Sequence, residues 1–165
     1  MLFAAVISGF RFNTGKDYSI YEDFFTGNIP ISGVEPGFLL FSQLTFMADN
    51  TGRLGFLICS MVTLFGFAHF FNRIYKSQRF LCLHLYLTIP LFYVSSFNLV
   101  RSNMATAIML FAIIFLIDKK RTYFLITSLT AFFLHLSAPL MITPFMFLQK
   151  YLKSSIVILP YIGLF

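Results

Sequence analysis

The stretch NLVRSNMATA, residues 98–107, decides how the rest of this chain is organised. It places Arg101 between two apolar runs, Phe80–Phe97 and Met104–Ile117, each long enough to cross most of a bilayer. An arginine at mid-membrane costs about 2.5–3.5 kcal/mol on insertion scales, so such residues usually lie in water-lined or protein-lined places and serve a function. The alternative is an arginine at the interface whose side chain reaches the lipid headgroups and does nothing else.

Polar and small residues accompany this arginine. Asn98 and Ser102 add donors and acceptors that lipid could not satisfy. At helical spacing Asn98, Arg101 and Ala105 share one face with Ala112, where small residues allow a neighbouring helix to approach. The stretch therefore predicts a polar helix face that is directed toward protein.

Composition sets the class of fold. Of the 165 residues, 58% are hydrophobic, 11% are charged and 24 are phenylalanine. These values fit a polytopic membrane protein and not a soluble domain. We therefore predict an all-α fold, a polytopic bundle of transmembrane helices with about five full or partial spans.

The net charge of +6 is explained by the positions of the basic residues relative to the predicted membrane spans. The basic residues gather in three short gaps between apolar runs, which face the cytoplasm under the positive-inside rule. The three clusters are Arg73, Lys76 and Arg79; Lys119, Lys120 and Arg121; and Lys150 with Lys153. Five of the six acidic residues precede the first full span, on the opposite side. The basic balance therefore gives no reason to expect a nucleic-acid partner.

The apolar runs define the predicted spans. These cover Leu54–Phe71, Phe80–Phe97, Leu99–Ile117, Thr122–Leu136 and Pro139–Leu152. Pro90 is expected to kink the second of them. One long tilted helix over residues 122–152 is the alternative to the last two spans, and it would put Lys150 outside.

The chain is predicted to be a single transmembrane domain, residues 1–165, and a fragment of a longer protein. Residues 1–10 look like the end of a truncated helix, residues 11–53 form an outer loop with interfacial helices, and residues 54–165 carry the spans. In the outer loop Asp17 is placed to cap a short helix. Pro36 suits the first position of a second helix, which ends at Ala48.

Aromatic residues of the outer loop form a stripe. Tyr18, Tyr21 and Phe25 recur at positions i, i+3 and i+7, which is typical of one helix face. Two interpretations stay open: the side chains lie at the membrane interface, or their rings stack on sugars.

Because successive spans cross the membrane in opposite directions, the polar residues with no evident structural role are predicted to lie on the same side of it. If the basic clusters are cytoplasmic, residues 11–33, Glu35, Arg101 and His135 all lie at the outer face. We therefore expect a functional site there.

His135 is a candidate for acid–base chemistry. At helical spacing it shares a face of small or polar groups with Ser128, Ala131 and Ala138, so it is expected to point toward protein. An imidazole side chain suits a general base or a ligand for a phosphate or hydroxyl. The alternative is a histidine that forms a hydrogen bond between helices and has only a structural role.

Asp17 and Glu35 are candidate general bases or metal ligands. The acids of the outer loop show no recognised metal-ligand spacing, and no His or Cys joins them nearby, so neither a metal nor a cofactor is predicted. Cys59 and Cys82 lie inside apolar runs and are expected to be buried free thiols.

Four motifs occur in order along most of the chain. They are RxxTGxDYxxY at 11–21, EPGF at 35–38, NxxRxxxA at 98–105 and FxHxSA at 133–138. In this order and approximate spacing they resemble the EpsG family, polytopic Wzy-like polymerases of exopolysaccharide and O-antigen repeat units. Ser102 stands where that family is expected to have glutamine after the arginine.

The resemblance implies extension of a glycan on an undecaprenyl diphosphate carrier, at the outer face of the bacterial inner (plasma) membrane. Other polysaccharide-assembly membrane proteins are possible partners. Arg101, His135 and Asp17 would be catalytic. The implied substrate-binding residues are Arg11, Tyr18, Tyr21, Glu35, Asn98 and Ser137. The competing class is a lipid-linked-sugar flippase or other transporter, which would also hold arginine and histidine in a polar cavity.

Overall fold

The computed structural model describes residues 2–28 and 33–141, and within these ranges it contains helices and no β-strand. The prediction of an all-α fold is confirmed for this part of the chain. The elements are α1 (Leu2–Gly9), α2 (Tyr18–Phe25), α3 (Pro36–Ala48), α4 (Arg53–Ile74), α5 (Arg79–Thr88), η1 (Ser95–Phe97), α6 (Val100–Ile117), α7 (Arg121–Leu134) and η2 (Ala138–Met141), where η marks a 3-10 helix.

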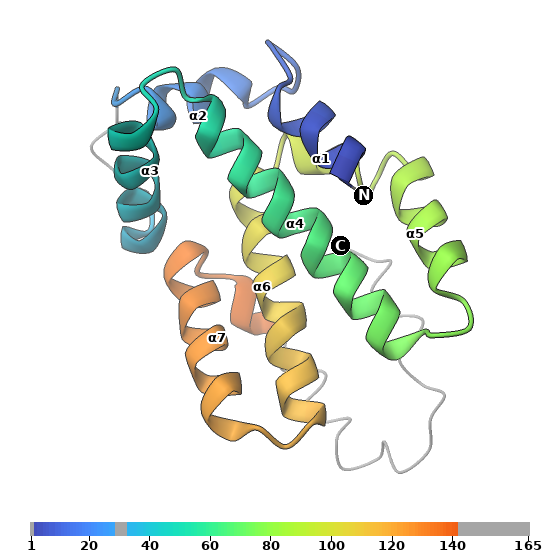
Figure 1. The fold of residues 1–165 in the computed structure, drawn as a ribbon. Coiled ribbons are helices and arrows are strands. Elements are labelled where there is room, and N and C mark those ends of the chain that lie inside the picture. Colours follow the sequence, from blue (N-terminus) through green and yellow to red (C-terminus); the bar gives the residue numbers. More distant parts are fainter. Residues whose placement is uncertain (1, 29–32, 142–165) are drawn as a thin grey trace.

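Helix α6 is the centre of the bundle. It packs against α4 on one side and α7 on the other, and α1 lies on α4 (Figure 1). Gly66 allows α4 to approach closely, because a Cβ there would lie only 2.7 Å from the Cβ of Ala107 in α6. Among the described helices, α4 and α6 are long and apolar enough to cross a bilayer.

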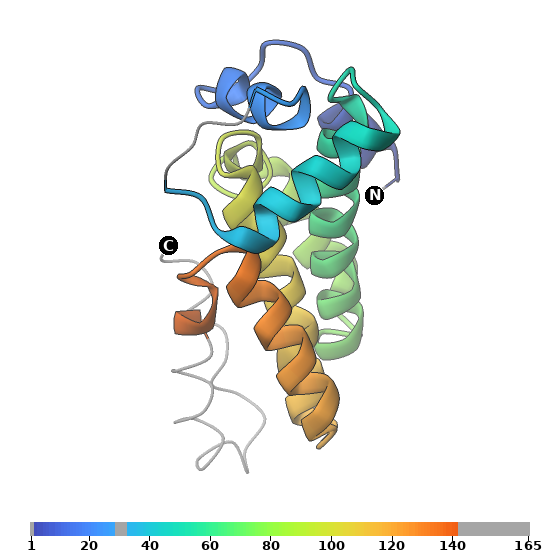
Figure 2. The ribbon, with the colours of Figure 1, turned by 90° about the vertical axis from the view of Figure 1, so that its left-hand side faces the viewer.

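Helices α2 and α3 lie across one end of this bundle (Figure 2). The aromatic stripe of α2 faces inward, and Tyr18, Tyr21 and Phe25 are at most 8% exposed. The Tyr18 ring stacks on Phe56 of α4 at 5.0 Å between centroids, and the Phe25 ring packs on Phe38 of α3. The stripe is therefore part of the protein core, which neither of the two earlier interpretations anticipated.

Several predicted helices are confirmed with close bounds. Helix α3 occupies Pro36–Ala48 with its proline in the first turn, and α6 covers the predicted span Leu99–Ile117 except for its first residue. Helix α4 extends the predicted span at both ends, and α7 begins one residue early and ends two residues early. Pro139–Leu152 falls largely outside the described residues, so the choice between two short spans and one long helix stays a prediction.

The predicted span Phe80–Phe97 is wrong. Helix α5 has only 10 residues and ends at Thr88, and turns and η1 follow it. Pro90 lacks the N–H that a continuing helix needs, so it ends the helix and does not merely kink it. The hydroxyls of Ser95 and Ser96 then donate to the backbone carbonyls of Phe92 and Tyr93, which favours tight turns.

Two of the basic clusters lie at the same end of the bundle. Nη2 of Arg73, at the end of α4, is 2.7 Å from Oδ1 of Asp118, which directly follows α6. In Figure 1 this end lies opposite α2 and α3. The arrangement agrees with the expectation that both clusters share one side of the membrane.

Candidate active site centred on Glu35

Glu35 joins two residues that lie far from it in the sequence. Its Oε2 forms an ion pair with Nη1 of Arg101 at 2.6 Å, and its Oε1 lies 2.8 Å from Nδ1 of His135. The backbone N–H of Leu136 also donates to Oε1, at 3.2 Å. The carboxylate side chain is only 8% exposed. One buried carboxylate thus holds the start of α6 and the end of α7 together.

The EPGF motif explains how Glu35 reaches this place. Glu35 precedes α3 with extended backbone angles, φ −65° and ψ 139°, and Pro36 begins the helix without needing a hydrogen bond. Gly37 lies against the end of α7, since a Cβ there would be 2.6 Å from the carbonyl oxygen of Phe133. Phe38 is fully buried and lies below the Arg101 guanidinium, 5.7 Å from ring centroid to Cζ. The four residues of the motif therefore supply, in order, the carboxylate, the helix start, the close contact with α7 and the aromatic ring next to Arg101.

His135 lies just beyond helix α7 and not within it. Its backbone is extended, with φ −159° and ψ 118°, because α7 ends at Leu134. The predicted helical face of Ser128, Ala131, His135 and Ala138 is therefore wrong, since the helix does not continue to the last two residues. The prediction that the imidazole points toward protein is confirmed by its contact with Glu35.

Arg101 is the second residue of α6 and is directed into the protein. Its side chain is 24% exposed, and the pairing with Glu35 argues against an arginine that only reaches for lipid headgroups. Asn98 precedes α6, so it does not share a helical face with Arg101 as predicted. Its Oδ1 instead accepts a hydrogen bond from the backbone N–H of Lys16 at 2.7 Å.

The environment favours the ionised form of Glu35. Burial by itself acts to raise the pKa of this carboxyl. The N–H of Glu35 itself, the N–H of Leu136, the His135 ring and the Arg101 charge all act in the opposite direction and prevail. The pKa of Glu35 is therefore lowered from its ordinary value, and the group is an anion at neutral pH.

Arg11 is not part of the Glu35 cluster and instead contacts aromatic rings and backbone carbonyls of other segments. Its guanidinium lies between the rings of Phe56 and Phe97, at 4.8 and 4.9 Å from their centroids, and donates to the carbonyls of Ser8 and Phe97. Burial lowers the pKa of this arginine. These contacts attach the outer loop to η1.

Gly15 completes this attachment. Its φ of +109° is disfavoured for other residues, and a Cβ would lie 2.9 Å from the carbonyl oxygen of Phe97. The first and third motifs therefore pack directly on each other.

The remaining predicted site residues differ in their contacts. The pKa of Tyr21 is raised by burial, while a hydrogen bond with the Arg101 backbone and the Arg101 charge oppose this rise. Tyr18 donates to Glu22 at 3.2 Å. Asp17 precedes α2 at the predicted position but makes no capping hydrogen bond with its side chain. Ser137 is exposed. Their assignment to substrate stays a prediction.

Sequence reasoning missed that Glu35 is the shared partner of Arg101 and His135. It placed all three on one side but could not pair residues 66 and 100 positions apart. The EPGF motif was the available signal, because a glycine directly after Pro36 indicates a close backbone contact. In the described part of the chain no group of three or more metal-binding side chains is found.

Gly37→Ala is expected to destabilise the protein by about 1–3 kcal/mol, because the new methyl group would overlap the end of α7. The measurement is thermal unfolding of the purified chain in detergent. Gln43→Ala, an exposed change on the same helix, is the matched control and should have little effect. Equal stability of the two variants would show that the contact between α3 and α7 is loose.

These features describe a helical bundle with two helices long and apolar enough to cross a membrane, and with a buried, ion-paired carboxylate where α6 begins and α7 ends. The chain matches the EpsG family over residues 1–165, its whole length. It therefore belongs to the EpsG family, a family of Wzy-like polymerases. Comparison with curated proteins and with solved structures found no match.

Proposed function

We propose that this protein extends an exopolysaccharide or O-antigen from repeat units linked to undecaprenyl diphosphate, at the outer face of the bacterial plasma membrane. The single observation that carries the proposal is the bridge from His135 through Glu35 to Arg101. It puts a candidate base and a candidate phosphate ligand on one carboxylate. Membership of the EpsG family supplies the polysaccharide context.

In this reaction an acceptor hydroxyl replaces the diphosphate on the anomeric carbon of the donor sugar. The hydroxyl must lose a proton as the new bond forms. Nδ1 of His135 lies 2.8 Å from Oε1 of Glu35, and a carboxylate can only accept, so the contact selects the tautomer with its proton on Nδ1 and leaves Nε2 as the proton acceptor. Among the described residues the ring has no hydrogen-bond partner other than Glu35, so Nε2 is available to a hydroxyl.

The leaving diphosphate gains negative charge as its bond to the sugar breaks. Arg101 uses Nη1 for Glu35, and its planar guanidinium keeps further N–H donors for a phosphate oxygen. Donors fixed at the place where charge develops contribute more to the transition state than to the ground state. Glu35 therefore holds both Arg101 and His135 in place for this step.

The charge distribution supports an outward site. Arg101 of the Glu35 cluster is the second residue of α6, whereas Asp118, paired with Arg73, directly follows α6, so the cluster and the basic residues lie at opposite ends of this central helix. With the basic end cytoplasmic, the site faces the compartment in which lipid-linked repeat units are presented.

Arg101→Lys tests the proposal in the full chain. Lysine keeps the charge that pairs with Glu35 but loses the two-pronged donor that matches a phosphate, so turnover should fall on the order of 10²-fold. The assay is long-chain glycan made from lipid-linked repeat units in detergent micelles. Micelles have no sides, so polymer formed there requires an enzyme and excludes the transporter alternative. If the lysine variant makes normal amounts of polymer, Arg101 does not bind the diphosphate, and its role is limited to the ion pair with Glu35.

A further inference from the structure

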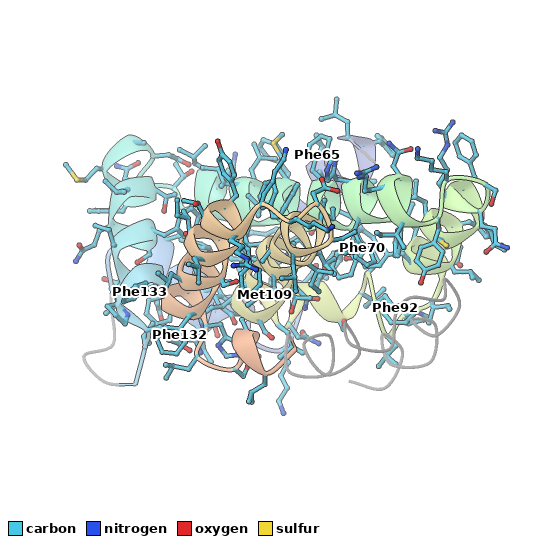
Figure 3. All side chains as sticks on the ribbon, turned by 90° about the horizontal axis from the view of Figure 1, so that it is seen from below. Phe65, Phe70, Phe92, Met109, Phe132 and Phe133 are labelled. Carbon is cyan, nitrogen blue, oxygen red and sulfur yellow. The ribbon has the colours of Figure 1, made fainter. Side chains whose placement is uncertain are left out.

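A second polar feature lies between α4 and α5, well away from Glu35. A groove of about 370 Å³ opens there, and neither the Glu35 site nor the outer loop contributes to it. Its lining includes Phe65, His69 and Asn72 from α4, and Arg79, Phe80 and Leu83 from α5. Figure 3 shows Phe65 at the margin of the bundle and Phe70 toward its interior, and their exposed fractions of 48% and 1% agree.

The lining is polar at one end and apolar at the other. Nη1 of Arg79 donates to Oδ1 of Asn72 at 3.0 Å, close to the loop that joins the two helices. Phe65 lies seven residues before Asn72, which places it about 10 Å farther along α4. Leu83 lies four residues after Arg79, about 6 Å along α5 in the same direction. The polar end is thus at the basic end of the bundle, and the apolar end lies deeper.

Arg79 is available to an anion. Arg73 is paired with Asp118, whereas the contacts of Arg79 within the described residues are the neutral Asn72 and the face of Phe80, 4.8 Å from Cζ to the ring centroid. Lys76, in the loop just before α5, is exposed but does not line the groove. The groove therefore carries an uncompensated positive charge at its mouth.

We infer that this groove binds one anionic phospholipid of the cytoplasmic leaflet. A phosphodiester headgroup would lie at Arg79 and Asn72, and an acyl chain would follow Phe65 and Leu83 toward the bilayer centre. Charge complementarity and the depth of the apolar surface both select this ligand, because a free phosphate would not use the apolar half. His69 stacks on Phe111 of α6 at 5.1 Å and thereby connects the groove to the central helix. Lipid binding here is independent of the reaction proposed for the Glu35 site.

The test is a titration of the purified full chain with phosphatidylglycerol or phosphatidylcholine, in which bound lipids are counted by native mass spectrometry. Arg79→Gln should weaken phosphatidylglycerol binding roughly fivefold and leave phosphatidylcholine binding unchanged. Lys76→Gln removes one positive charge from the loop just before α5, outside the groove lining, so it should weaken binding less than twofold. Leu83→Trp fills the apolar half while all charges remain, and it should also reduce phosphatidylglycerol binding.

Three results would overturn the inference. Equal losses from Arg79→Gln and Lys76→Gln would show only a charged surface. In a competition arm, glycerol phosphate is added to the chain with bound phosphatidylglycerol. If it displaces this lipid as strongly as further phosphatidylglycerol does, the groove is a site for free phosphate. Unchanged binding in both Arg79→Gln and Leu83→Trp would remove the groove as the lipid site.

Discussion

Glu35→Gln is expected to lower polymer formation between about 10²- and 10⁴-fold at unchanged substrate supply. The amide keeps the size of the side chain but loses the charge that both Arg101 and His135 contact at 2.6 and 2.8 Å. Without that charge, protonation of His135 during the reaction is no longer stabilised, and Arg101 keeps a partly buried charge without a partner. The readout is long-chain glycan per mole of protein in the membrane.

Glu22→Gln is the matched control. It makes the same chemical change in the outer loop, where the Glu22 carboxylate accepts only a 3.2 Å hydrogen bond from Tyr18 among its described side-chain contacts. Near-normal polymer is expected from this variant. If the two glutamine variants lose activity equally, the acids act as a general charged surface and Glu35 has no special role.

The pH dependence of stability provides an independent readout for Glu35. Because its pKa is lowered from 4.5 in the folded chain, the ion pair contributes its full stability above the unfolded value. That contribution is lost as the pH falls through the lower folded value. The stability difference between wild type and Glu35→Gln should therefore be largest near neutrality and disappear in acid.

His135→Ala is expected to abolish glycan extension while membrane abundance stays within about twofold of wild type, since the ring is partly exposed. The variant removes the proposed proton acceptor but leaves the Glu35–Arg101 ion pair in place. Added imidazole should restore part of the activity, because it can occupy the vacated position and accept the proton. His84→Ala, at an exposed position on α5, should behave as wild type.

The alternative role of His135 makes a different prediction. If the histidine only ties α7 to α3, abundance and activity should fall in parallel, and imidazole should not restore turnover. That outcome would remove the acid–base assignment while leaving the membership of the family untouched.

The sequence predicted helices well where local signals were complete. Pro36 at a helix start and the turn residues after Ala48 define α3, and the uninterrupted apolar run defines α4. It failed at Phe80–Phe97, where apolar composition favoured a span but Pro90 and the two serines favoured turns. Hydropathy over a window does not register a single missing N–H.

The site was predicted as a set of residues and not as a geometry. Charge alternation placed Glu35, Arg101 and His135 at one end, yet their pairing depends on how α3 packs on α7. That packing leaves no room for a side chain at Gly37, where a Cβ would lie 2.6 Å from the carbonyl oxygen of Phe133. Burial of Tyr18 and Tyr21 was missed for another reason, because a stripe of aromatic residues has the same sequence pattern whether it faces lipid or protein.

The shared carboxylate also constrains how this protein can evolve. Loss of Glu35 leaves an arginine without its counter-ion, and loss of Arg101 leaves a buried anion, so either change alone is costly. Changes at the three positions are coupled energetically because they meet at one group. Lineages that abandon the site should therefore lose several of its members together, whereas those that keep it should hold all three fixed while the lipid-facing residues drift.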